Sequence, residues 1–374
     1  MTRRNVRTSL CDRLGIEHPI VGFTPSEHVA AAISRAGGLG VLGCVRFNDP
    51  ADVDAALTFM DENTDGKPYG VDVVMPAKVP SEGAEFDLAK LVPEGHRKWV
   101  DDTLLKLGVP PLPDDSRQGG AVLGWLHSVA RQHVEVAMSH RASLIANALG
   151  SPPDDVIKLA HDHNMLVAAL AGKAEHARRH VDRGVDIVVA QGYEAGGHTG
   201  EIATMVLVPE VVDAVGADVP VLAAGGIGSG RQVAAALALG ASGAWMGTAW
   251  LTSEEYKLTV SQTAMHAALL SATSSDTVRA RIYSGKPARL LKNSWTKAWE
   301  EPGAPEPLPM PLQNVLVADA HQRLMNSGNP DVVPMPTGQI VGRFNESRPV
   351  ADMIASLLSE ADETLARLEA LRKP

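Results

Sequence analysis

Short apolar segments alternate with helical segments along the first two thirds of the chain, and this alternation constrains the fold more than any other feature. Eight segments have the length and apolar content of buried strands: residues 19–23, 39–42, 69–75, 142–147, 166–170, 185–191, 219–224 and 243–246. Helical patterns separate most of them, at residues 26–35, 122–140, 153–163, 174–183, 208–215 and 230–239. Repeated strand–helix units are typical of parallel sheets. Eight units favour a (β/α)8 TIM barrel over an open doubly wound sheet.

The rest of the chain is predicted to add to this barrel. We expect residues 1–251 to form the barrel, with a Pro- and charge-rich insertion at about 76–118 that has some helix at 96–107. A long insertion after a strand is typical of a lid or substrate-binding element, although a surface excursion fits equally well. Residues 252–374 form a C-terminal extension, which ends in an amphipathic helix predicted at 350–371. We expect this extension to be helical and to pack on the barrel or to help form a homodimer.

Charge and cysteine content exclude several protein classes. The formal net charge of −10 and the pI of about 5.7 argue against nucleic-acid binding, which usually needs a basic face. Cys11 and Cys44 are the only cysteines, so neither a zinc ribbon nor a disulfide scaffold is expected, and a reducing cytoplasm suits the chain. No apolar run is long enough for a membrane span, and no signal peptide is expected.

One candidate motif lies at residues 190–200, which read Ala-Gln-Gly-Tyr-Glu-Ala-Gly-Gly-His-Thr-Gly directly after the sixth strand. The strand delivers Gln191, and glycines then let the backbone approach a ligand closely. His198 can exchange protons near neutral pH. Ligands of a barrel bind at the C-terminal ends of its strands, so this loop predicts an active-site edge. Glu194 could orient His198 or face water.

A second motif lies at residues 223–230, Ala-Ala-Gly-Gly-Ile-Gly-Ser-Gly, which close the seventh strand and open a helix. Free backbone N–H groups and the helix dipole make such a corner an anion site. Gly247 and Thr248 follow the eighth strand, and barrels often hold a phosphate between the loops after strands seven and eight. These corners favour a mononucleotide such as FMN. The G-x-G-x-x-G spacing of a dinucleotide site is absent.

Together, residues 191–198, 223–227 and 247–248 resemble the nitronate monooxygenase family, formerly called 2-nitropropane dioxygenase, and flavin-dependent enoyl reductases of the same superfamily. Further matches lie at residues 36–40, 67–71 and 338–342. The resemblance implies an FMN-dependent barrel oxidoreductase. In such an enzyme His198 would be the base that removes an α-proton, and electrons would pass to the flavin and then to oxygen. No metal is expected. The positions that we expect at the cofactor are Gly22, Phe23, Asp72, Gln191, Gly196, Gly197, Gly225, Gly226, Gly247, Thr248 and Gln339.

Two positions depart from the family pattern. Residues 22–25 read Gly-Phe-Thr-Pro where members usually carry Ala-Pro-Met, and Asp72 stands where many have Asn. Both lie at strand ends that face the expected site, so they bear on the substrate more than on the cofactor. Asp72 could pair with a cation or stay charged beside the flavin.

Three functions stay open on the sequence. The first is a nitronate monooxygenase. The second is a flavin-dependent reductase or dehydrogenase of a CoA thioester or an enone in lipid or steroid breakdown, and the third is a phosphate-binding barrel enzyme without redox chemistry. A run of basic residues could meet CoA phosphates, although a solvated face is favoured. That run comprises Arg279, Arg281, Lys286, Arg289 and Lys292.

Overall fold

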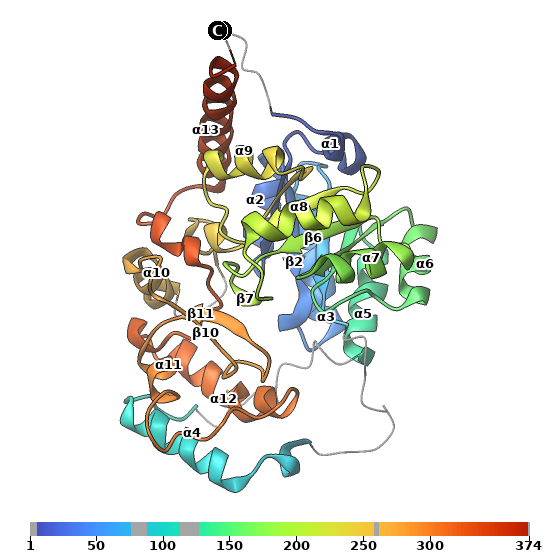
Figure 1. The fold of residues 1–374 in the computed structure, drawn as a ribbon. Coiled ribbons are helices and arrows are strands. Elements are labelled where there is room, and N and C mark those ends of the chain that lie inside the picture. Colours follow the sequence, from blue (N-terminus) through green and yellow to red (C-terminus); the bar gives the residue numbers. More distant parts are fainter. Residues whose placement is uncertain (1–5, 76–87, 113–126, 258–261, 373–374) are drawn as a thin grey trace.

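Eight parallel strands close into a barrel in this computed structural model, which describes residues 6–75, 88–112, 127–257 and 262–372 (Figure 1). The strands, in barrel order, are β1 (Ile20–Thr24), β2 (Leu39–Gly43), β3 (Tyr69–Val73), β4 (Ala142–Asn147), β5 (Leu166–Ala171), β6 (Ile187–Gln191), β8 (Val221–Ala224) and β9 (Gly243–Met246). Pairing of Val21 with Trp245 joins β1 to β9 and closes the ring. The predicted TIM barrel is confirmed, and each predicted strand overlaps an observed one.

Helices surround the barrel on its outer side. They are α2 (Glu27–Arg35), α3 (Pro50–Asn63), α5 (His127–Met138), α6 (Asp154–Asp162), α7 (Ala174–Asp182), α8 (Thr204–Val215) and α9 (Gly230–Ala238). Helix α3 was not predicted from the sequence. Its N-cap residue, Asp49, accepts the Ala51 N–H at 2.8 Å. Of the helix predicted at 122–140, residues 122–126 lie outside the described residues.

The barrel interior is filled by alternate strand side chains. Val21, Val41, Leu144 and Val189 belong to one buried cluster, which α1 (Ser9–Leu14) extends with its own apolar residues. Close packing also fixes the helices on the strands. A Cβ at Gly40 would lie 1.9 Å from the Ala30 carbonyl oxygen, so only glycine lets α2 approach β2 this closely.

The insertion after β3 and part of the C-terminal extension pack against each other. Helix α4 (Glu94–Lys106), from the insertion, shares a hydrophobic cluster with α11 (Ser294–Ala298) and α12 (Leu312–Asn326) (Figure 1). Trp99, Trp295 and Trp299 meet there, with ring centroids 4.5–6.4 Å apart. The rest of the insertion, at 76–87 and 113–126, lies outside the described residues.

A small antiparallel sheet joins this second cluster to the barrel. Its order is β10 (Thr277–Ala280), β11 (Ala288–Leu291) and β7 (Gly197–His198). The two-residue strand β7 belongs to the predicted glycine-rich loop, and Ala288 of β11 pairs with His198. Residues of the extension therefore fix the backbone of that loop.

The chain then returns to the barrel wall. Helix α13 (Val350–Ala370) packs on α9 and α2 (Figure 1). The remaining elements are α10 (Gln262–Ser271) and the short 3-10 helices η1 (Cys44–Arg46), η2 (Leu88–Leu91), η4 (Thr248–Thr252), η5 (Pro330–Val332) and η6 (Gln339–Arg343). In the described part of the chain, no helix combines the length and apolar character that crossing a membrane requires.

Candidate functional site

A cavity of about 410 Å³ opens at the C-terminal ends of the barrel strands. Most of the predicted site residues line it, although they come from six separate stretches of chain. These residues are Phe23, Asp72, Gln191, Gly196, Gly197, His198, Gly225, Gly226, Gly247 and Thr248. The barrel topology thus brings both sequence motifs to one cavity, at the face where TIM barrels bind their ligands.

Gly22 and Gln339 do not line this cavity, so their place at the cofactor stays a prediction. A Cβ at Gly22 would lie 2.4 Å from Ile33 Cδ1 and 2.8 Å from Trp250 Nε1, so this glycine serves the packing of the barrel wall. Gln339 uses its backbone N–H to donate to the Glu194 carbonyl oxygen at 3.0 Å. That bond ties the end of the extension to the glycine-rich loop.

His198 is held by a buried hydroxyl group. Its Nε2 lies 2.5 Å from Oγ of the fully buried Ser284, and that oxygen also accepts the Lys286 N–H at 3.3 Å. Burial lowers the pKa of His198 to about 4, and the Lys286 ammonium group adds to the effect. The imidazole is therefore neutral at neutral pH and can accept a proton.

Two arginines fix the loop on either side of His198. Arg289 donates to the Tyr193 carbonyl oxygen from Nε at 3.2 Å and from Nη2 at 3.0 Å. Its guanidinium group also lies 4.4 Å from the centroid of the Tyr193 ring. Arg279 donates to the Thr199 carbonyl oxygen at 3.2 Å. The solvated face favoured for the basic run is wrong for Arg289, which is only 3% exposed.

Glu194 contacts the start of α8 and makes no hydrogen bond to His198. Its Oε2 accepts the Thr204 N–H at 2.9 Å and the Thr204 hydroxyl at 2.8 Å, at the first residue of α8. A carboxylate at a helix N-terminus satisfies free donors and complements the helix dipole. Glu194 therefore anchors the loop to α8.

Asp72 lines the cavity as a buried acid. Its side chain is 3% exposed, and burial raises its pKa well above the usual range. No described residue pairs with it as a cation, and its burial favours the neutral carboxylic acid over the charged form considered from the sequence. Such an acid offers one donor and one acceptor, much like an asparagine amide.

The cavity fits a flavin phosphate at its glycine-lined end. Gly225 has φ +102° and Gly226 has φ +69°, which are conformations that favour glycine. Gly247 and Thr248 line the same cavity at the start of η4. Backbone groups in such turns form concave anion sites. Nearby, Phe23 and Trp245 stack with ring centroids 6.3 Å apart, which suits a flat aromatic ring.

The start of α9, also expected at the phosphate, is already occupied by the protein's own side chains. The Gly228 N–H donates to Gln232 Oε1 at 3.0 Å, and the Gly230 N–H donates to Glu360 Oε2 at 2.7 Å. Because Glu360 belongs to α13, the C-terminal helix covers this corner. The glycine-lined end is therefore limited to the turns after β8 and β9.

Helix α12 contributes a cavity wall that the sequence analysis did not predict. Asn314, Val317, Ala318 and His321 line the cavity at the i, i+3, i+4 and i+7 spacing of one helical face. This spacing is visible in the sequence. It could not be assigned to the site, because the fold alone places α12 over the barrel.

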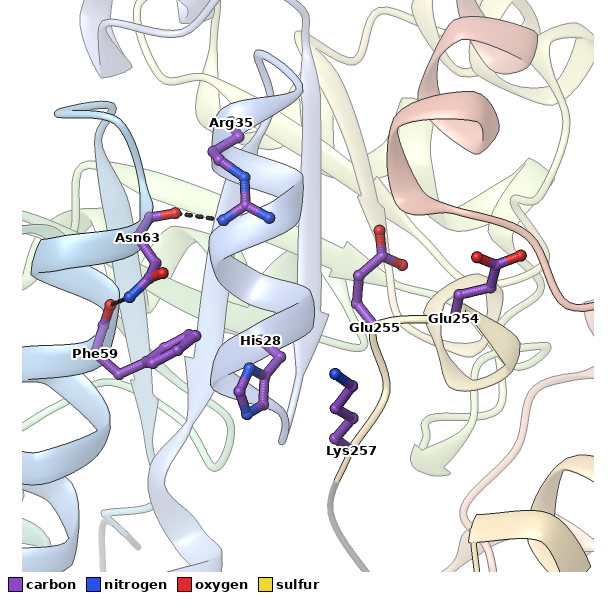
Figure 2. Close-up of a pocket in the computed structure, with 7 residues that line it drawn as sticks. All are labelled: His28, Arg35, Phe59, Asn63, Glu254, Glu255 and Lys257. Carbon is purple, nitrogen blue, oxygen red and sulfur yellow. Dashed lines mark hydrogen bonds between the residues drawn. The ribbon is translucent and has the colours of Figure 1, made fainter.

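A second pocket, of about 350 Å³, lies on the outside of the barrel beside α2 and α3 (Figure 2). Its lining is His28, Arg35, Phe59, Asn63, Glu254, Glu255 and Lys257. None of these residues was a candidate from the sequence. Glu255 accepts the N–H of the first residue of α13 at 3.0 Å, so part of this lining serves packing. Within the described ranges, no group of His, Cys, Asp and Glu side chains is arranged to hold a metal.

Comparison with known proteins places this arrangement in a family. The family model described as nitronate monooxygenase matches residues 7–360. The chain is 47% identical to a Mycobacterium tuberculosis protein named "Putative monooxygenase Rv1533", over 98% of this chain and 99% of that protein. It is 26% identical to a Staphylococcus aureus protein named "Probable nitronate monooxygenase", over 96% of this chain and 98% of that protein.

Two solved structures resemble the whole fold. Nitroalkane oxidase from Streptomyces ansochromogenes has a TM-score of 0.78 at 26% identity, covering 96% of this chain and all of that one. FabK from Thermotoga maritima has a TM-score of 0.73 at 28% identity, covering 98% of this chain and 99% of that one. These relationships exclude the barrel without redox chemistry. The chain belongs to the nitronate monooxygenase family and is a flavin-dependent oxidoreductase.

Proposed function

We propose that this chain is an FMN-dependent nitronate monooxygenase in which His198 is the catalytic base. One observation carries the proposal: a neutral histidine, held by Ser284, lies in the same cavity as the glycine-lined turns at Gly225 and Gly247. The likeness to a nitroalkane oxidase supports a nitro compound as substrate. Bound FMN would accept electrons from the substrate and pass them to oxygen.

The residues of this chain would perform the proton transfer. Because Nε2 of His198 faces Ser284, Nδ1 is the ring nitrogen without a partner among the described residues. In the tautomer that carries the proton on Nε2, that N–H donates to Ser284 and Nδ1 takes the α-proton. Negative charge that develops on the substrate beside the ring favours the imidazolium form. Phe23, Gln191 and the glycine-lined turns would hold the cofactor.

A second candidate is a flavin-dependent reductase or dehydrogenase of an enone or a CoA thioester. The neutral acid of Asp72 favours it, because a protonated carboxyl group can donate a hydrogen bond to a carbonyl oxygen. The described lining of the cavity holds neither Arg nor Lys. CoA phosphates would therefore lack a cation there, so an enone suits this candidate better.

The same proposal includes a cytoplasmic protein that forms a homodimer, with the barrel over residues 1–251 and the extension over 252–374. Light scattering on the purified protein tests the dimer directly. A mass equal to one chain would refute it.

Purified protein provides the test of the main proposal. Its absorption spectrum and the chromatographic identity of the released flavin test FMN. Anaerobic mixing with a nitroalkane, its nitronate, an enone and an acyl-CoA then identifies the compound that bleaches the flavin bands. Bleaching by the nitro compounds alone, with oxygen uptake on readmitting air, is expected.

Two variants test the base. His198→Asn should keep the flavin but lose proton abstraction from the nitroalkane. His163→Asn, at an exposed helix end, is the matched control and should behave like the unchanged protein. Equal nitroalkane turnover in both variants would remove His198 from the mechanism.

A further inference from the structure

Helix α12 carries two buried polar atoms that have no hydrogen-bond partner among the described residues. Oδ1 of Asn314 and Nε2 of His321 are buried, and no described residue makes a hydrogen bond to either. Both residues line the cavity, with Val317 and Ala318 between them on the helix. Buried polar atoms are almost always paired, so two orphans on one cavity wall indicate a missing ligand group.

Two residues beside these atoms, Gln313 and Arg323, fix helix α12 in place. Gln313 donates to the Ile282 carbonyl oxygen at 2.8 Å and accepts the Leu308 N–H at 2.9 Å. Arg323 donates to the carbonyl oxygens of Pro110 at 3.0 Å and Val109 at 3.2 Å. These bonds hold the helix on both sides of the stretch that carries the unpaired atoms.

Consecutive residues connect this wall to the catalytic base. The Tyr283 ring stacks on the His321 ring with centroids 4.9 Å apart, while the hydroxyl of Ser284 contacts His198. Tyr283 also lines the cavity. A ligand that reaches His198 with its reacting carbon therefore has α12 within the same cavity for another part of its structure.

The surroundings of the two orphans are uncharged. Burial lowers the pKa of His321 to about 4, with no charged neighbour contributing, so the ring is neutral at neutral pH. Its ring neighbours are Tyr283 and Trp295, and the described cavity lining has no Arg or Lys. A carboxylate or phosphate would find no counter-charge here. An uncharged hydroxyl group needs none and can donate to Oδ1 of Asn314, and a hydroxyl or carbonyl oxygen can accept from His321 when its Nε2 carries the proton.

We propose that Asn314 and His321 form a polar anchor that binds an uncharged hydrogen-bonding group of the substrate, away from the carbon that reacts at His198. This proposal rests on the proposed function and defines its substrate class: a nitro compound whose carbon skeleton also carries a hydroxyl or carbonyl group. The apolar residues between the anchor atoms contact the skeleton itself.

Two compounds of nearly equal size provide the test. 3-Nitropropan-1-ol has a hydroxyl group where 1-nitrobutane has a methyl group. Binding is measured by calorimetry on flavin-loaded His198→Asn protein, which cannot remove the proton, and turnover is measured on otherwise unchanged enzyme. We expect the alcohol to bind with an about tenfold lower Kd, because one good buried hydrogen bond contributes roughly that much to affinity.

Variants of α12 assign the effect. His321→Leu and Asn314→Leu should each remove most of the preference, whereas His321→Gln should keep part of it. Asn326→Leu, at an exposed position near the end of the same helix, is the matched control and should change nothing. Thermal unfolding of each variant shows that it is folded before binding is compared.

The outcomes separate the two proposals. Equal binding of the two compounds, or a preference that survives both leucine variants, would overturn the anchor. Tighter binding of 3-nitropropionate than of the alcohol would overturn its uncharged character. If neither nitro compound is turned over but the alcohol preference depends on His321, the anchor stands and the proposed reaction fails.

Discussion

The pH dependence of proton abstraction should show how strongly the fold changes His198. Its pKa falls from the ordinary 6.5 to about 4. That difference corresponds to roughly 3 kcal/mol in favour of the neutral ring. A base of this kind stays available well below neutral pH. We therefore predict that the pH profile of kcat/KM for a neutral nitroalkane has a rising limb centred near pH 4. From about pH 5 to 7 the profile should be flat.

Removing the charge of Lys286 tests the cause of the lowered His198 pKa. Burial is the larger cause of the shift and the Lys286 charge the smaller one, so Lys286→Met should move the limb upward but not as far as pH 6.5. Lys297→Met, at an exposed position, should leave the limb unchanged. A limb near pH 6.5 in the unchanged enzyme, or the same limb after Lys286→Met, would refute the reasoning.

The same burial affects folding, and the assay must allow for it. Because the pKa of His198 is lower in the folded chain than in the unfolded chain, the unfolded chain binds more protons below pH 6.5. Stability should therefore decrease as the pH falls from 6.5 towards 4, and His321 adds to this decrease. Rates are measured directly after a pH jump, with the far-ultraviolet dichroism recorded in parallel.

Three further variants test contacts around the site. Arg289→Met should lower the free energy of unfolding by about 3 kcal/mol, because it removes charged donors to the Tyr193 carbonyl oxygen, and a urea titration measures this. Asp72→Asn should raise that free energy at pH 7, where the folded acid must hold a proton that the unfolded one releases. The gain should vanish below pH 3.8, and a gain that persists there would contradict it. Burial raises the pKa of Glu360, but hydrogen bonds from the Gly230 N–H and two arginines lower it overall. Glu360→Gln should therefore cost about 1 kcal/mol at pH 7, with the difference lost as the pH falls below 4.5.

The sequence predicts the barrel well because each strand is a local pattern. Buried parallel strands are continuous apolar runs, and Gln191 and His198 follow one such run directly, so their place at the strand ends follows from topology. The role of an individual glycine is harder to predict from the sequence. Gly22 and Gly225 look alike in the sequence, but one makes room for Ile33 and Trp250 and the other turns the chain beside the cavity.

Long-range contacts account for what the sequence analysis missed. The sequence favours a solvated surface position for Arg289. Pairing of β11 with β7 instead brings Arg289 into contact with Tyr193. Likewise Asn314 and His321 read as ordinary polar positions of an amphipathic helix. Their role depends on the packing of α12 against α4, more than 200 residues away in the sequence.

The pairing of β7 with β11 has a consequence for how this enzyme could be divided or recombined. All eight barrel strands end by Met246, but the backbone at His198 is held by Ala288, beyond the last of them. A gene fragment that stops at residue 251 would encode all eight barrel strands but would lack Ala288, the pairing partner of His198. Exchange of residues 252–374 between relatives would therefore replace the backbone support of His198 along with the α12 wall of the cavity, so the two features would be inherited together.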